Sequence, residues 1–214
     1  MKTLIATAAL LCAAGAANAA MVMQTLPYGF PLSPGDQTLA FDQFDPALGT
    51  LTKVELFLTG FMGASATAEN DSDLDAPAFS LSLSGNMSAT FGTLSAIGLV
   101  NAAFAQALLA SDNGGVANGS GPDFHDFGVV GDVFGDDDST MVGLAPFIGL
   151  GTLDADIAGS AGFSFQGSTD ATLGIDQLGA FGDVKVIYTY DPIPAPGAMA
   201  LLGLAGLTGI RRRR

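Results

Sequence analysis

The sequence is poor in the residue types on which many proteins depend for catalysis or for covalent stability. Its 214 residues include no Trp, one Cys, one His and only seven Lys and Arg. A single Cys cannot form a disulfide within the chain, so packing must stabilise the fold. One imidazole also falls short of the several nitrogen or sulfur ligands that zinc sites use.

Acidic residues dominate the charge. The chain has 21 Asp and Glu and a net charge of −14, and all the acids lie between Asp36 and Asp191. Only Lys53 and Lys185 offset these 21 charges in that stretch, which leaves −19. Such a charge excludes nucleic acid and anionic lipid headgroups as natural partners. The hydrophobic fraction of 49% is too high for a disordered stalk, so a folded domain is expected.

The first 19 residues have the three parts of a secretory signal peptide. Lys2 supplies the positive charge, residues 4–11 are apolar, and Ala17-Asn18-Ala19 is a box of small residues suited to cleavage. We predict cleavage after Ala19. Cys12 lies inside this segment, so the exported chain would contain no cysteine.

The C-terminal residues form a second three-part segment, with a proline-flanked motif, an uncharged run and a terminal basic cluster. The motif consists of Pro194, Ala195, Pro196 and Gly197, and the cluster consists of Arg211, Arg212, Arg213 and Arg214. We predict a membrane helix over residues 197–210, which at about 1.5 Å per residue reaches only ~21 Å of a ~30 Å hydrocarbon core. The four arginines would act as a stop-transfer cluster at the cytoplasmic face.

Residues 192–214 resemble the PEP-CTERM sorting signal, which bacterial exosortases recognise and process. Ala195 stands where the family motif has Glu, which gives a Pro-Ala-Pro-Gly variant. The resemblance implies Sec export, a precursor tethered to the inner membrane, and release to the cell surface or the extracellular matrix. An exosortase-type enzyme would be a partner, and exopolysaccharide a second one. An ordinary C-terminal anchor helix is the alternative.

Residues 20–191 predict an all-β fold, an antiparallel two-layer β-sandwich. Apolar residues alternate with polar ones in several stretches, which is typical of half-buried strands. The stretches are Met21–Leu26 (ended by Pro27-Tyr28-Gly29), Gln37–Phe41, Leu51–Thr59, Phe79–Ser84, Phe163–Gln166 and Asp183–Tyr190. Leu94–Ala110 fits two strands, or one short helix capped by Thr93. Asn113–Gly121 and Asp132–Asp138 are predicted to be loops.

A second resemblance concerns the two ends of this domain. The segment from Phe41 to Val54 and the segment from Val184 to Tyr190 resemble the opening and the closing strand of the "choice-of-anchor E" domain. Members of that family are bacterial surface domains that carry one of several alternative C-terminal anchors. The resemblance implies a surface location and a β-rich architecture, and it implies no activity.

Candidate sites for chemistry in the domain are few. His125 lies between Asp123 and Asp126, but no Gly-x-Ser-x-Gly motif supplies a nucleophile for it. Asp71, Asp73 and Asp75 could offer oxygen ligands to Ca²⁺, although Ala76 and Ser82 depart from the EF-hand pattern. We therefore expect a non-enzymatic surface protein. The alternatives are a Ca²⁺-dependent polysaccharide-binding or adhesion module that uses the acidic loops, and a secreted hydrolase.

Overall fold

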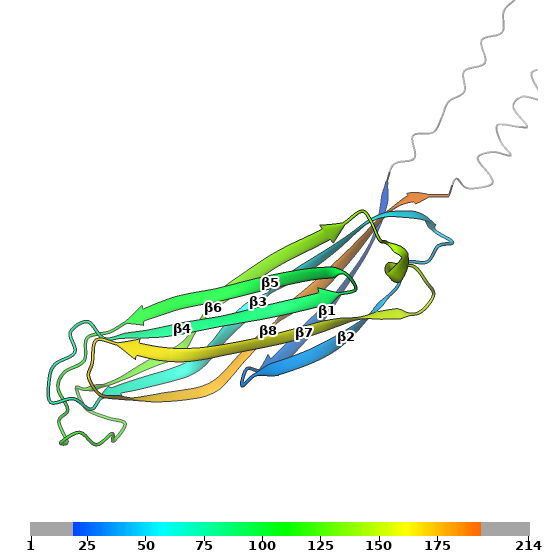
Figure 1. Cartoon of the computed structure of the whole chain (residues 1–214). Coiled ribbons are helices and arrows are strands. Elements are labelled where there is room, and N and C mark those ends of the chain that lie inside the picture. The colour runs from blue at the N-terminus through cyan, green and yellow to red at the C-terminus, as the bar shows by residue number, and fades with distance from the viewer. Residues whose placement is uncertain (1–18, 194–214) are drawn as a thin grey trace, which may run out of the picture.

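Residues 19–193 of the computed structural model form eight β-strands and one 3-10 turn (Figure 1). The strands are β1 (Ala20–Pro31), β2 (Gly35–Asp42), β3 (Gly49–Asn70), β4 (Ser80–Phe91), β5 (Leu94–Ala105), β6 (Phe124–Thr140), β7 (Thr152–Gln166) and β8 (Ala171–Pro192). The 3-10 turn η1 spans Ala145–Phe147. Within these residues no helix is long and apolar enough to span a membrane.

The strands form two antiparallel four-stranded sheets, in the orders β1-β8-β3-β6 and β2-β7-β4-β5. We refer to them as sheet A and sheet B. The prediction of an all-β antiparallel two-layer sandwich is confirmed, whereas the predicted signal-peptide and membrane helices lie outside the described residues. Apolar side chains from the two inner faces fill the space between the sheets, as period-two strands require. Fully buried large side chains of the sheets include Tyr188, Phe41, Phe91, Leu56, Leu58 and Met62, and Phe79 and Phe147 join them from the connections.

Side chains close both sides of the sandwich. At one side, Gln24 of β1 donates to the Asp42 carbonyl oxygen of β2 at 2.8 Å and accepts from the Asp42 N–H at 3.0 Å. At the other side, Asp136 and Asp138 of β6 accept hydrogen bonds from main-chain N–H groups of β5, as described below. The edge strands are therefore bonded to each other, which blunts their tendency to pair with other chains.

The molecule is a long rod with two distinct ends (Figure 1). β3 and β8 each contain 22 residues, and a strand of that length spans roughly 70 Å at about 3.3 Å per residue. Ala20 pairs with Tyr190, so the chain enters and leaves the sandwich at one end, which we call the proximal end. The opposite, distal end is built from the connections at residues 71–79, 106–123 and 167–170.

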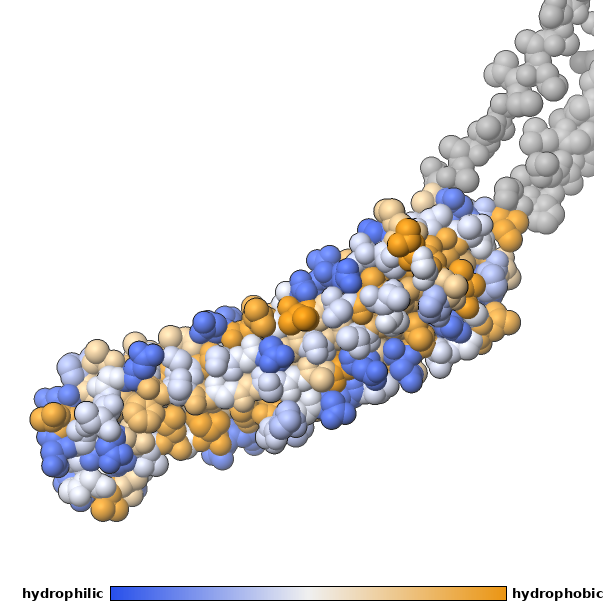
Figure 2. Space-filling model, in the orientation of Figure 1, coloured by the Kyte–Doolittle hydropathy of each residue, from blue (hydrophilic) through white to orange (hydrophobic). Residues whose placement is uncertain are grey.

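The outer surface of the rod is mixed in character. Figure 2 shows hydrophilic and hydrophobic residues interspersed along the whole length of the face in view. Such mixing is expected of strands that alternate between a buried and a solvent-facing side, because small apolar residues are tolerated among polar ones at the surface.

Residues 94–105 form the single strand β5, so the strand interpretation of this segment is confirmed and the helix alternative is wrong; the side chains of Leu94, Ala96 and Val100 alternate into the core. Two further expectations about single segments are wrong. Residues 132–138 belong to strand β6, where they pair with β3. The first strand does not end at Leu26: Pro27 continues β1 opposite Asp183, since an edge strand tolerates a residue without an N–H.

Candidate functional site

The predicted sorting and cleavage residues adjoin the proximal end in sequence. The last described residue, Ile193, donates its N–H to the Leu48 carbonyl oxygen at 3.2 Å, and Ala19 is the first described residue. Because β1 pairs with β8, the first and the last described residues lie at the same end of the rod. The remaining predicted residues lie outside the described part of the chain: Ala17, Pro194, Ala195, Pro196, Gly197, Arg211, Arg212, Arg213 and Arg214.

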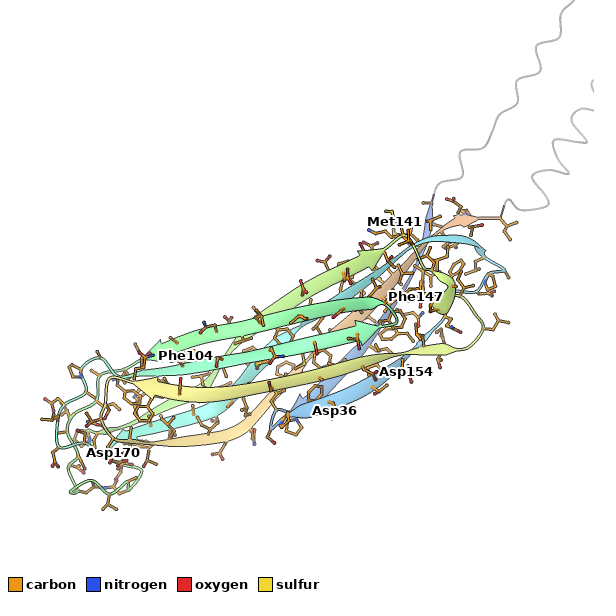
Figure 3. The ribbon with its side chains drawn as sticks, viewed as in Figure 1. Asp36, Phe104, Met141, Phe147, Asp154 and Asp170 are labelled. Carbon is orange, nitrogen blue, oxygen red and sulfur yellow. The ribbon has the colours of Figure 1, made fainter. Side chains whose placement is uncertain are left out.

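Apart from the tyrosines, the polar side chains that the described residues bury all lie at the distal end. They are Glu69, Asn70, Asp71, Ser72 and Asp123, each less than a tenth exposed. Figure 3 marks this end by Asp170, far from Met141 and Phe147 at the proximal end. Buried polar groups are costly unless they are hydrogen-bonded, so the partners of these five residues define what this end can do.

Asn70 and Glu69 attach the distal loops to the end of β3. The Asn70 amide donates to the carbonyl oxygens of Leu74 and Leu109, at 2.9 and 2.6 Å. The Glu69 carboxylate accepts from the N–H groups of Asn118 and Gly119, at 2.8 and 2.7 Å. The glycine-rich loop over residues 113–121, predicted as a loop, is thus folded against the sandwich by charge-assisted bonds.

The structure does not bring Asp71, Asp73 and Asp75 together. They follow β3 in a bent connection, so the two-residue spacing does not place their side chains on one face. Asp71 accepts from the Thr172 hydroxyl at 2.7 Å and Asp75 from the Ala110 N–H at 2.8 Å, while Asp73 is exposed. Within residues 19–193, no three His, Cys, Asp or Glu side chains gather closely enough to hold a metal ion.

Two buried carboxylate oxygens at the distal end lack a hydrogen-bond partner. They are Asp71 Oδ1 and Asp123 Oδ1. No basic side chain of the described residues compensates them. Lys53 is 2.7 Å from Glu55, and the Lys185 ammonium lies 4.1 Å from the centre of the Phe57 ring, both away from the distal end.

No sequence motif marks Asp123 as part of a site, although its other oxygen organises the loop. Asp123 Oδ2 accepts from the Asp112 N–H at 3.1 Å, across 11 residues of chain. No spacing pattern identifies such a pair, because the loop between them has to fold before they meet. Only the run of Gly, Asn and Ser between them indicates that the chain turns back here.

His125 lies at the start of β6 and contacts an aromatic ring. Its imidazole packs edge-on against Phe127, with ring centroids 4.7 Å apart and planes at 87°. Among the described residues, no side-chain hydrogen bond involves this ring, so no serine or carboxylate orients it. The geometry expected of a catalytic triad is not present around this imidazole.

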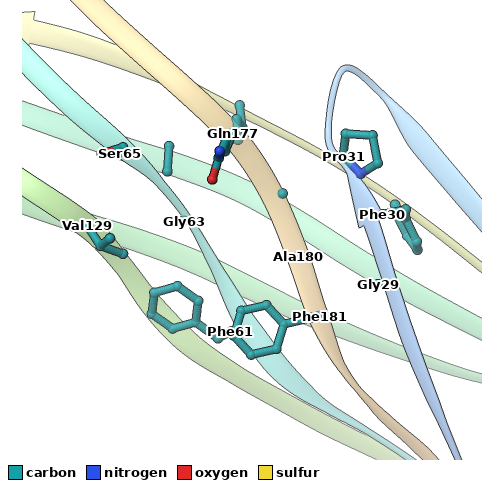
Figure 4. A pocket seen from close by; sticks show the side chains of 13 residues that line it. Gly29, Phe30, Pro31, Phe61, Gly63, Ser65, Val129, Gln177, Ala180 and Phe181 are labelled. Atoms are coloured by element: carbon teal, nitrogen blue, oxygen red, sulfur yellow. The ribbon is translucent and has the colours of Figure 1, made fainter.

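The outer face of sheet A has an apolar hollow of about 620 Å³ where β1 ends (Figure 4). Phe61 and Phe181 lie at its wall with ring centroids 5.6 Å apart, and Val129 lies on the neighbouring strand. Gln177 also lines it, in a bulge of β8 with a φ angle of 57°, which is unusual for a residue other than glycine. No charged side chain from the described part of the chain lines this hollow.

Two tyrosines point into the core of the sandwich and are kept neutral there. Burial raises the pKa of Tyr28 well above its usual range, and Asp183 adds to the effect. Burial likewise raises the pKa of Tyr188, with a smaller contribution from Asp42. The hydroxyl groups donate to the main-chain oxygens of Thr59 and Asp42, at 3.2 and 3.1 Å, so they serve the fold rather than a reaction.

Comparison with known proteins gives no family. No family model matches the chain, and no curated protein matches it. Among solved structures, the "Structure of infectious bursal disease virus Gt strain" aligns with 10% identity over 87% of this chain and 46% of that chain, at a TM-score of 0.10. The chain thus spans less than half of that protein, and a TM-score of this size supports no inference about fold or function.

Proposed function

We propose that this protein is an exported, non-enzymatic bacterial surface or matrix protein, sorted by an exosortase-type enzyme. One observation carries the proposal: a proline-flanked motif at residues 194–197 precedes a short apolar run and four terminal arginines. The apolar run is shorter than the thickness of the hydrocarbon core, so we interpret it as a temporary anchor and not a permanent one. The protein would then remain at the cell surface or in the extracellular polysaccharide.

The arrangement of the rod supports this proposal. Because β1 and β8 pair, the predicted signal and sorting segments both adjoin the proximal end. A precursor held by its C-terminal segment would extend its distal loops roughly 70 Å from the membrane, given the length of β3. A long, closed sandwich of this kind suits a spacer or a display module, and its acidity keeps it soluble outside the cell.

The edge-on packing of His125 against Phe127 supports the non-enzymatic part of the proposal. A general base needs to lie within hydrogen-bond reach of the group it deprotonates and is usually oriented by a third group. The hydrolase alternative would therefore need a site that does not use this imidazole.

The sorting proposal is tested by the double substitution Pro194→Ala and Pro196→Ala in the native host. We expect a full-length precursor that stays in the membrane fraction, because the processing enzyme loses its recognition segment. Mass spectrometry of the C-terminus and fractionation of the cells measure this directly. Pro34→Ala, at an exposed proline of the β1–β2 turn, is the matched control and should be processed normally. A mature protein of normal size from the double variant would refute the sorting proposal.

A further inference from the structure

A buried carboxylate at the distal end lies beside a glycine of the neighbouring loop. Asp123 is fully buried, and among the described residues only one of its two oxygens has a partner, the Asp112 N–H. The other oxygen, Oδ1, has none. An unpaired buried carboxylate oxygen loses its hydration without compensation, which is a cost that native proteins rarely keep without a reason.

A second carboxylate converges on the same position. A Cβ atom placed on Gly121 would lie 2.6 Å from Asp112 Oδ2 and 2.7 Å from Asp123 Oδ1. The two oxygens are therefore at most about 5.3 Å apart, the sum of these distances, with only a glycine between them. Gly121 has a φ angle of 105°, which favours glycine and leaves the space beside it clear of a side chain.

No positive group of the described residues balances this pair. The two lysines lie elsewhere, against Glu55 and the Phe57 ring. Like charges this close repel each other unless a cation or donor lies between them. Asp112 and Gly121 are exposed whereas Asp123 Oδ1 is buried, so an ion from solvent would reach the two oxygens through a shift of this exposed loop and not of the core.

We propose that Asp112 and Asp123 bind a calcium ion beside Gly121. The donors are carboxylate oxygens only, which suit Ca²⁺ and suit zinc poorly. Ca²⁺ accepts six to eight oxygen ligands in flexible geometry, so water and main-chain carbonyl groups of the loop can complete the shell. Two carboxylates predict a weak site, in the range of about 10⁻⁴–10⁻³ M that extracellular modules use.

Binding would fasten the loop over residues 106–123 to the start of β6. Asp112 belongs to the outgoing half of this loop and Asp123 to its return, so one ion would join the two halves. The inference does not depend on the proposed sorting function, because the tail takes no part in it. Its success or failure therefore leaves the sorting proposal unchanged.

The test is thermal denaturation of the full chain in detergent, after removal of metal with EDTA. We expect Ca²⁺ at about a hundred times its Kd to raise Tm by about 5–10 °C, and Mg²⁺ at the same concentration to raise it less. Asp112→Asn and Asp123→Asn should lose this shift. Asp73→Asn is the matched control, since Asp73 is an exposed carboxylate at the same end, and it should keep the shift.

Asp112→Asn is the decisive variant if Asp123→Asn folds poorly. The side chain of Asp112 is exposed, and its N–H, which bonds Asp123, is unchanged by the substitution. Luminescence of bound Tb³⁺, a Ca²⁺ substitute, gives a second measure of binding. An unshifted Tm in the original chain, or a full shift in Asp112→Asn, would overturn the proposal. A more stable Asp123→Asn protein, together with an unshifted Tm of the original chain in Ca²⁺, would show that the carboxylate only destabilises the fold.

Discussion

The side of the sandwich between β5 and β6 depends on two inward-pointing aspartates. Asp136 Oδ2 accepts from the Ile97 N–H at 2.7 Å, and Asp138 Oδ2 accepts from the Ser95 N–H at 2.9 Å. Both acceptors are ionised carboxylates, and both donors belong to the outer edge of β5. Replacing the two aspartates by alanine would leave that edge unbonded.

The magnitude follows from the number and exposure of these bonds. A hydrogen bond to a charged group contributes about 1.5–3 kcal/mol when buried, but this side of the sandwich is exposed and solvent competes for both partners. We therefore expect about 0.5–1 kcal/mol for each bond and about 1–2 kcal/mol for the pair. For a domain of this size the loss corresponds to a fall in Tm of about 3–6 °C. The exposed β5 edge should also promote self-association.

The assay compares thermal melting and size-exclusion chromatography of the double variant Asp136→Ala, Asp138→Ala with those of Asp137→Ala. Asp137 lies between the two aspartates in β6, points to the opposite face, and makes no side-chain hydrogen bond among the described residues. Its substitution removes one charge without touching β5. Equal Tm values for the double variant and the control, with both monomeric, would refute the role assigned to the aspartates.

Two further predictions concern the core. Leu56→Ala should lower the free energy of unfolding by about 2–5 kcal/mol in a denaturant titration, because Leu56 is fully buried between the sheets; a loss below about 1 kcal/mol would contradict that packing. Burial raises the pKa of Tyr28 and Tyr188, with smaller contributions from Asp183 and Asp42. Because the folded protein favours the neutral hydroxyl groups, this contribution to stability is complete below the unfolded pKa of 10.0 and is lost as the pH rises above that value. Absorbance at alkaline pH should show these two rings ionising only as the protein unfolds. Tyr188→Phe should remove one of these two ionisation signals.

The alternating strands could be predicted because burial on one face leaves a direct record in the sequence. Leu81 and Leu83 are fully buried, and Ser82 between them faces outward, as the period of two requires. Val184, Val186 and Tyr188 repeat the pattern in β8. The lengths of the strands could not be predicted in the same way. β3 extends to Asn70 through glycine and alanine, which carry little periodic signal.

In the acidic part of strand β6, local composition predicts a loop where the structure has a strand. Three consecutive aspartates are typical of a solvated loop, and the acidic composition predicts a loop over Asp132–Asp138. In the structure two of these aspartates accept hydrogen bonds from β5 and the third faces solvent, so all three side chains are compatible with a strand. Their role depends on which strand lies beside β6, and β5 reaches that position only through the pairing order of the whole sandwich.

The distal end could not be predicted for a related reason. Glu69 and Asp123 are single acids without a motif, and the loops that surround them come from three separate connections. The acids of residues 71–75 stand out in the sequence by their regular spacing, but regular spacing has a geometric meaning only inside a strand or helix. The pair at Asp112 and Asp123 instead depends on a long loop that folds back over the end of β3.

The two ends of the rod differ in the kind of partner that their charges allow. The predicted sorting segment, which follows β8 in sequence, holds four arginines, whereas the distal end buries three carboxylates among residues that include no lysine or arginine. Cleavage of the signal peptide and processing of the tail would remove Lys2 and those arginines and leave Lys53 and Lys185 as the only lysine or arginine side chains of the exported chain. Any charge that compensates the distal carboxylates must then come from solvent, and outside a cell the abundant candidates are metal cations. A protein made for display outside the membrane would therefore be most responsive to divalent cations at the end that lies farthest from its tether.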